Sequence, residues 1–380
     1  MKPGRFAVAV ALTALVTMPV LGDDPRPEHL SALGPPPEPA DNPSTPEKIE
    51  LGKKLFFDPK LSGNNGMPCS NCHVPAVGWD VPSSISPGYP GTAHWRNSQT
   101  IVNSAYYGKL FWAGASKSFR GQARSAARGG VAGNGEDDVM EARLALVPEY
   151  REAFREVFGD SYPKVRNAYM AIAAFERTLV QRDTPFDQFM RGDDDALSRQ
   201  QKRGLELFTG KANCIACHSG PLLSDQKYYN IGVPPHDGWE KNALAQITFR
   251  YEIYSKGASE DVYRSIKSDP GLYFQTKQKR DMGKFRTPSL RYTKYTAPYM
   301  HNGSLPTLRA VVEFYNEGGG KNDFSHTKSP LIEPLELTDQ EVNDLLAFLE
   351  TLSGDPIQIE RPDVPDMEPL PRAPADREEG

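Results

Sequence analysis

The sequence of 380 residues is poor in cysteine and carries no excess of positive charge. Its formal net charge of −5 gives no reason to expect a nucleic-acid partner, because such binding rests on Lys and Arg side chains that neutralise phosphates. The apolar run at residues 6–20 has about 15 residues, too few to span a bilayer. Hydrophobic periodicity is helical wherever it is clear, and no region is rich in strand patterns. We therefore expect no membrane span and a helical fold.

The few cysteines are all used in two copies of one pattern, CSNCH at residues 69–73 and CIACH at residues 214–218. A CxxC pair can be a redox dithiol or half of a zinc site, but a histidine directly after the second cysteine is typical of covalent c-type haem attachment. The cysteines would form thioethers to the porphyrin, and each histidine would be the proximal iron ligand. These residues are Cys69, Cys72 and His73 in the first copy, and Cys214, Cys217 and His218 in the second.

The alternative is that the four thiols form disulfides or share one zinc ion. In zinc ribbons the two CxxC pairs are much closer together than the 145 residues that separate His73 from His218. The arrangement therefore predicts two covalently bound c-type haems.

The N-terminus fits this interpretation, because c-type haem is attached outside the cytoplasm. Lys2 and Arg5 precede the apolar run, and small residues around Gly22 form a cleavage site, as in a secretory signal peptide. A retained membrane anchor is the alternative. We expect a periplasmic protein divided into a signal peptide (1–23), a Pro-rich N-terminal arm (24–45), a first domain (46–192), a second domain (193–354) and a Pro-rich C-terminal tail (355–380). The two Pro-rich ends are predicted to be extended and weakly ordered.

Each CxxCH segment lies between two amphipathic helical patterns. ELGKKLFFDPKL (50–61) and QKRGLELFTGKA (201–212) precede the two segments, with Ser44 or Thr45 and then Ser198 as predicted N-caps. KVRNAYMAIAAFERTLV (164–180) and TDQEVNDLLAFLETL (338–352) follow them, the latter starting with a capping box of Thr338 and Glu341. Two helices around a CxxCH haem are typical of cytochrome c. The predicted fold is all-α, with two tandem cytochrome c-like domains that each bind one covalent c-type haem.

Further motifs connect the chain to a known family. FWAGASKSFRGQA (111–123) and RTPSLRYTKYTAPYMHNGSLPTLRAVVEFYNEGG (286–319) occur together with the two CxxCH segments. In this combination the sequence resembles the bacterial di-haem cytochrome c peroxidase family, including its MauG branch, from about Leu51 to Leu352.

The resemblance implies different roles for the two haems. The haem of His73 would react with peroxide, and the haem of His218 would store or relay an electron. The distal ligand of the second haem falls on Tyr315, where peroxidases of this family have methionine and the MauG branch has tyrosine. A phenolate favours ferric and higher iron states, whereas a thioether favours ferrous iron. The alternative is that Met300 or Met282 binds this iron.

Other positions are implied by the same resemblance. Trp112 would stand between the haems and pass electrons, although a tryptophan in this setting is also ordinary core. Asn97, Thr296 and Pro298 match an inter-domain calcium site, whose amide and carbonyl oxygens suit a hard cation.

The sequence departs from the family at two functional positions. Gln122 matches a distal-pocket glutamine, but the distal glutamate falls on Ala132. Cleavage of bound peroxide needs a group that takes and returns a proton. Glu136, or its neighbours Asp137 and Asp138, could supply the carboxylate, unless this segment is a solvated turn before a helix. A surface tryptophan used by MauG corresponds to Ala212.

Three functions remain open. The first is a peroxide-dependent oxidoreductase in which a high-valent state at an open haem, shared through Trp112, oxidises an external donor or a protein substrate. The second is a conventional cytochrome c peroxidase that removes hydrogen peroxide with electrons from a small periplasmic cytochrome or cupredoxin. The third is a di-haem electron carrier without enzymatic activity. Tyr315 favours the first, Gln122 and Trp112 favour both enzymes, and Ala132 favours the carrier.

Overall fold

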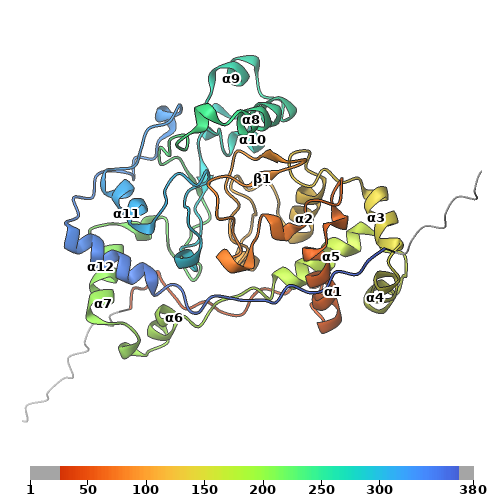
Figure 1. Cartoon of the computed structure of the whole chain (residues 1–380). Helices are drawn as coiled ribbons and strands as arrows, with labels where there is room; N and C mark the ends of the chain where they lie inside the picture. Colours follow the sequence, from red (N-terminus) through yellow and green to blue (C-terminus); the bar gives the residue numbers. More distant parts are fainter. Residues whose placement is uncertain (1–25, 368–380) are drawn as a thin grey trace, which may run out of the picture.

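The computed structural model describes residues 26–367, so the predicted signal peptide and the end of the C-terminal tail lie outside the described residues. Helices make up nearly all of the regular structure, as Figure 1 shows. The described strands form two antiparallel pairs of two residues each, β1 (Pro87–Gly88) with β2 (Thr92–Ala93) and β3 (Tyr228–Tyr229) with β4 (Phe285–Arg286). The predicted all-α class is confirmed. Within residues 26–367 no helix is both long and apolar enough to cross a membrane.

The first module is built on two crossed helices, α1 (Pro46–Phe57) and α5 (Val165–Glu176). Thr45 caps α1, because its side chain accepts a hydrogen bond from the Lys48 N–H. Three further helices surround the pair: α2 (Phe119–Arg128), α3 (Asp137–Ala145) and α4 (Pro148–Phe158). The two helices predicted on either side of CSNCH are therefore present and in contact.

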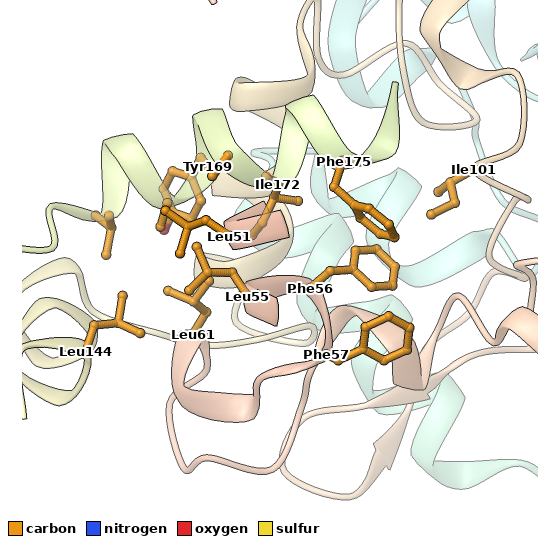
Figure 2. Close-up of a cluster of buried hydrophobic side chains, with 14 of the residues drawn as sticks. Leu51, Leu55, Phe56, Phe57, Leu61, Ile101, Leu144, Tyr169, Ile172 and Phe175 are labelled. Carbon is orange, nitrogen blue, oxygen red and sulfur yellow. The ribbon is translucent and has the colours of Figure 1, made fainter. Parts of the chain in front are cut away.

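The apolar faces of α1 and α5 form the core of this module. Figure 2 shows Leu55 and Phe56 of α1 facing Ile172 and Phe175 of α5. The Phe56 and Phe175 rings lie 5.4 Å apart between centroids. The apolar spacing in the sequence thus marks core, and the CSNCH segment packs against its edge through Cys69.

The second module repeats this plan with α7 (Arg199–Thr209) and α12 (Asp339–Glu350). Both helices begin with a complete capping box, Ser198 with Gln201 and Thr338 with Glu341. Two other helices, α6 (Pro185–Met190) and α11 (Leu308–Asn316), contribute to its core. Helix α6 precedes the predicted domain boundary at residue 193, yet its phenylalanines pack in the second core.

A third lobe was not foreseen from the sequence. It consists of α8 (Ala243–Ser255), α9 (Glu260–Ser265) and α10 (Tyr273–Thr276), which lie together at the top of Figure 1. Its small core contains Phe249 and Phe274 and takes in Trp95 from the first half of the chain. This lobe is therefore fixed to the segment that precedes Asn97.

The predicted arms are extended, but the expectation of weak order is wrong for residues 26–45 and 355–367. Leu30 is buried in the second core, and the His29 carbonyl accepts a hydrogen bond from the Gly220 N–H. The C-terminal segment crosses back to the first module, as the dark blue trace in Figure 1 shows. There the Ile357 carbonyl accepts a hydrogen bond from the Trp79 indole at 2.9 Å. Buried apolar side chains and hydrogen bonds hold both arms against the two modules.

Candidate haem sites and the path between them

Each CxxCH segment folds as a tight turn that places the histidine beside its cysteines. The His73 N–H donates to the Cys69 carbonyl at 3.1 Å, and the His218 N–H donates to the Cys214 carbonyl at 2.9 Å. All four cysteines are free thiols. Cys69 packs against the first core and Cys214 against the second, so the two pairs do not meet. In residues 26–367, no three Cys, His, Asp or Glu side chains are grouped to hold a metal ion. This arrangement does not fit the four-thiolate zinc alternative.

Burial keeps these thiols neutral. It raises the pKa of Cys69 to about 12, that of Cys72 to about 11 and that of Cys214 to about 12. A reactive dithiol or a zinc ligand needs an accessible thiolate. Neutral, partly buried sulfur atoms are instead compatible with thioether bonds to a porphyrin.

Both histidines are oriented by a backbone carbonyl. His73 Nδ1 lies 3.3 Å from the Trp79 carbonyl, and His218 Nδ1 lies 3.0 Å from the Leu223 carbonyl. Both carbonyl-bearing residues have left-handed backbone, with φ of 61° and 48°, which is uncommon for residues other than glycine. A proton on Nδ1 leaves the Nε2 lone pair free for a metal, and such a bond from the other ring nitrogen is typical of histidine ligands.

The charge state of these histidines also suits a metal ligand. Burial lowers the pKa of His73 to about 4, and burial lowers the pKa of His218 as well. Both rings are therefore neutral near pH 7, as metal ligation requires.

Unpartnered polar atoms near the two sites provide a further test of the fit. Tyr169 and Glu176 each have a buried oxygen without a hydrogen-bond partner, and both are close enough to Cys69 to interact with it electrostatically. On β3 and β4, the Tyr228 hydroxyl and the Arg286 Nε are buried and unpartnered too. A haem carries two carboxylate groups, which can accept hydrogen bonds from donors such as the tyrosine hydroxyls and the guanidinium. The residues present therefore fit a covalently bound haem at both sites.

Tyr315, near the end of α11, is placed beside the second site. Burial raises the pKa of its phenol, and the thiols of Cys214 and Cys217 are close enough to add to this effect. Met282 instead lies in the core of the third lobe, and Met300 lies in a turn with a φ of 74°. Of the three candidate ligands, Tyr315 is therefore the best placed, because it interacts electrostatically with Cys214 and Cys217.

Trp112 lies between two segments that reach the two histidines. Its indole N–H donates to a carbonyl of segment 97–99 at 2.9 Å, and its own carbonyl accepts an N–H of segment 286–288 at 2.9 Å. The first segment also provides a backbone partner for His73, and the second provides one for His218. Trp112 is therefore hydrogen-bonded to both of these segments.

This geometry agrees with what comparison with known proteins finds. Residues 46–195 match the family described as di-haem cytochrome c peroxidase. The chain is 54% identical to the cytochrome-c peroxidase IdrP1 of Denitromonas iodatirespirans over 370 residues, which cover 96% of this chain and 97% of that protein. The chain belongs to the di-haem cytochrome c peroxidase family.

Two more distant relatives give the same result. The methylamine utilization protein MauG of Methylorubrum extorquens is 35% identical over 330 residues, covering 87% of this chain and 84% of the relative. The crystal structure of a MauG-like protein associated with microbial copper homeostasis superimposes with a TM-score of 0.70 at 32% identity, covering 86% of this chain and 94% of that one. The protein is thus a peroxide-dependent di-haem enzyme.

The peroxidase's expected distal residues lie on α2 and at the start of α3. Gln122 is half-buried on α2. Glu136 is 71% exposed and pairs with Arg128 at 3.5 Å. Asp137 also pairs with Arg128, at 2.5 Å through Oδ2, while its Oδ1 is buried without a hydrogen-bond partner. Of the carboxylates in this segment, Asp137 is better placed than Glu136 to face the interior.

The three positions matched to the calcium site lie in two segments that touch. Asn97 is 4% exposed, and its N–H donates to the His301 carbonyl at 2.8 Å. Thr296 is also buried, and Pro298 follows a cis peptide bond in the same loop as His301. The hydrogen bond from Asn97 to His301 places Asn97 against the loop that contains Thr296 and Pro298.

Sequence reasoning missed the groups that surround the proximal histidines. The carbonyls of Trp79 and Leu223 carry no side-chain signal, so a sequence does not reveal them. Glu176 could have been noticed, because it lies one helical turn after Ile172 and directly follows the apolar run AIAAF, where a buried carboxylate needs a reason to be there. It is 4% exposed, and burial raises its pKa to about 8.

Proposed function

We propose that this peroxidase reduces hydrogen peroxide in the periplasm at the haem held by Cys69, Cys72 and His73, with electrons from a small cytochrome or cupredoxin. Electrons would pass from the site of His218 and Tyr315 through Trp112. The observation that carries the proposal is the position of Trp112, which is hydrogen-bonded to segments that reach both histidines. The haem supplies the redox chemistry, and the chain provides its ligands, its proton donors and the path between the sites.

Proton handling at the first site is assigned to Gln122 and a carboxylate of the segment after Ala132. Asp137 is the preferred carboxylate, with Glu136 as the alternative, because Asp137 Oδ1 is buried without a partner and Glu136 is mostly exposed. Tyr169, whose hydroxyl is also buried and unpartnered, interacts electrostatically with Asp137. Loss of the acid would slow peroxide cleavage, because a proton must reach the leaving oxygen.

A calcium ion bound by Asn97, Thr296 and Pro298 is part of the same proposal. Oxygen ligands and a buried position suit this cation, and the Asn97 to His301 hydrogen bond already joins the two segments. Calcium would stabilise the contact between the segment before Trp112 and the loop after Tyr295.

Tyr315 supports a second candidate, oxidation of a side chain on a protein substrate. A phenolate ligand stabilises higher iron oxidation states, which would let the oxidising equivalent persist until a substrate binds. The residue at the position of MauG's surface tryptophan, Ala212, is 5% exposed and cannot carry an electron. A substrate protein would therefore need another point of contact.

Stopped-flow absorbance after mixing the di-ferric enzyme with peroxide tests both functions. Rapid oxidation of a reduced small cytochrome c supports the scavenging peroxidase. A long-lived oxidised species that the cytochrome does not discharge supports oxidation of a protein. If the haem absorbance does not change with peroxide, the proposal is wrong and the protein carries electrons.

Replacement of Tyr315 by Met tests the ligand assignment separately. We expect a higher reduction potential at the second haem, because a neutral thioether favours ferrous iron. Met282→Leu serves as the control, since this residue lies in the third lobe. An unchanged potential in Tyr315→Met would remove Tyr315 from the iron.

A further inference from the structure

The four tryptophans of the chain differ in what their indole N–H groups contact. Trp79 and Trp112 donate to backbone carbonyls, each at 2.9 Å. Trp95 donates to a carboxylate, Asp269 Oδ2, at 3.0 Å. An indole that loses an electron becomes a strong acid at its nitrogen, so a carboxylate at this atom makes oxidation easier than a carbonyl does.

The surroundings of this pair reinforce the coupling between electron and proton. Trp95 is 6% exposed, and Asp269 is held by two hydrogen bonds from Arg96, at 2.5 and 2.8 Å. Burial alone would raise the pKa of Asp269. The adjacent Arg96 charge has the opposite and larger effect, so the pKa is lowered and the carboxylate is ionised near pH 7. The guanidinium also lies 5.6 Å from the Trp95 ring, which disfavours a cationic indole. Oxidation of Trp95 would therefore release its proton to Asp269.

Aromatic rings and the Arg96 guanidinium lie between Trp95 and Trp112. The Trp112 ring meets His301 edge-on with centroids 6.4 Å apart, and His301 stacks on Phe285 at 3.8 Å. The Arg96 guanidinium lies 5.6 Å from both the Phe285 ring and the Trp95 ring. Electron transfer slows steeply with distance, so a chain of side chains in contact favours it.

The same chain continues outward into the third lobe. Trp95 and Trp239 line one cleft together with His301 and His236. Phe249 lies between the two indoles, with its ring centroid 6.4 Å from Trp95 and 5.5 Å from Trp239. Trp239 is half-buried at this cleft, and the Nε2 atom of His236 is buried without a partner.

We propose that Trp95 is a redox-active residue that links Trp112 to the surface cleft at Trp239, with Asp269 as its proton acceptor. The oxidising equivalent from hydrogen peroxide removes one electron from Trp95 by way of Trp112. The Nε1 proton moves to Asp269, which leaves a neutral indole radical and an aspartic acid. A one-electron donor that contacts the protein surface at the half-buried Trp239 then returns an electron, and Asp269 returns the proton. Two such cycles supply the two electrons that, together with two protons from solvent, reduce one hydrogen peroxide to two waters. This inference rests on the proposed function and adds a second route to it.

Freeze-quench electron paramagnetic resonance of the holoenzyme, mixed with peroxide and no donor, tests the inference. We expect a tryptophan radical in the wild type, identified by the narrower signal of protein containing deuterated tryptophan. Trp95→Phe should lose this signal while its haem absorbance still changes with peroxide. An unchanged signal in Trp95→Phe overturns the inference. If wild-type haem absorbance does not respond to peroxide, the proposed function fails with it.

Two further variants keep the test decisive if Trp95→Phe does not fold. Asp269→Asn retains the ring without the proton acceptor, and the radical signal should disappear. With ferrocyanide added as the donor, Trp239→Phe should lengthen the lifetime of the radical and slow the oxidation of ferrocyanide, because the indole that accepts the donor's electron is lost. A retained radical in Asp269→Asn, or an unchanged lifetime in Trp239→Phe, contradicts the corresponding step.

Discussion

The two haem modules share a helix crossing that is repeated almost residue for residue. A Cβ added to Gly52 would lie 1.9 Å from the Ala171 carbonyl oxygen, and one added to Gly204 would lie 2.1 Å from that of Asp344. In each module a phenylalanine pair follows, with ring centroids 5.4 Å apart for Phe56 with Phe175 and 5.1 Å apart for Phe208 with Phe348. The closing helices α5 and α12 end in FERTL and FLETL. The common scaffold therefore specifies a helix pair and leaves the chemistry to other positions.

The modules differ where side chains face the CxxCH segments. The position after the closing phenylalanine is a buried glutamate, Glu176, in the first module and a leucine, Leu349, in the second. Beside the second CxxCH segment stands Tyr315. Near the first CxxCH segment stand the buried oxygens of Tyr169 and Glu176 instead. The comparison indicates that a buried carboxyl group stands near the first CxxCH segment and a phenol near the second.

Loss of the proximal ligand should separate the two modules most strongly. We expect His73→Gly to abolish the reaction with peroxide, because the proposed reactive iron loses its axial ligand. His218→Gly should still consume peroxide but fail to oxidise a reduced cytochrome. Stopped-flow absorbance measures both, and added imidazole should restore His73→Gly. Retained peroxide reactivity in His73→Gly would mean that the roles of the two haems are reversed.

The buried glutamate should make the stability of the first module depend on pH. The pKa of Glu176 is raised from 4.5 to about 8, so the folded state holds a proton that the unfolded state releases between these values. Stability should fall as pH rises from about 4.5 to 8, by on the order of 5 kcal/mol.

Exchanging the side chains of the two modules tests this origin. In Glu176→Leu, the free energy of unfolding by denaturant should depend less on pH between pH 5 and 8. Leu349→Glu should add a second pH dependence of stability, which arises from the second module. If Glu176→Leu unfolds with the wild-type pH profile, the carboxylate is not the cause.

The crossing glycines should cost similar free energies in the two modules. Gly52→Ala and Gly204→Ala each force a methyl group against a backbone carbonyl of the partner helix, and such overpacking typically costs about 1–3 kcal/mol. Urea unfolding measures the loss. Gly34→Ala serves as the control, because a Cβ added there has nothing within 4 Å. Gly159→Ala is unsuitable, because the φ of Gly159 is 73° and an alanine there would be strained. A Gly52→Ala protein as stable as Gly34→Ala would contradict the close crossing.

The smallest difference should come from the N-caps. Ser198 forms a complete capping box with Gln201, whereas Thr45 makes a single cap bond of 3.3 Å. Ser198→Ala should cost about 1 kcal/mol and Thr45→Ala less. Thermal unfolding of the two variants compares them, and a larger loss for Thr45→Ala would reverse this ranking.

Much of the fold could be predicted because the helices on either side of each CxxCH segment are indicated by signals in the local sequence. The CxxCH pattern, the caps at Ser198 and Thr338 and the apolar spacing in residues 164–180 all act within a few residues of the chain. The third lobe was missed because its core includes Trp95, which lies far from the helices of this lobe in the sequence. The arms were misjudged because proline content does not reveal that Leu30 and Ile357 find partners on the two modules.

The sequence by itself determined two haem attachment segments, the helices around them and the family, because covalent attachment and helix formation depend on residues close together in the chain. Only the tertiary structure decided which carbonyls orient His73 and His218, which side chains surround each site, and that Trp95 donates to Asp269. Trp95 and Asp269 are 174 residues apart in the sequence. The two carbonyl contacts are local, but they depend on left-handed backbone at Trp79 and Leu223, which these residue types do not indicate. Burial rather than local sequence sets the charge of the groups involved.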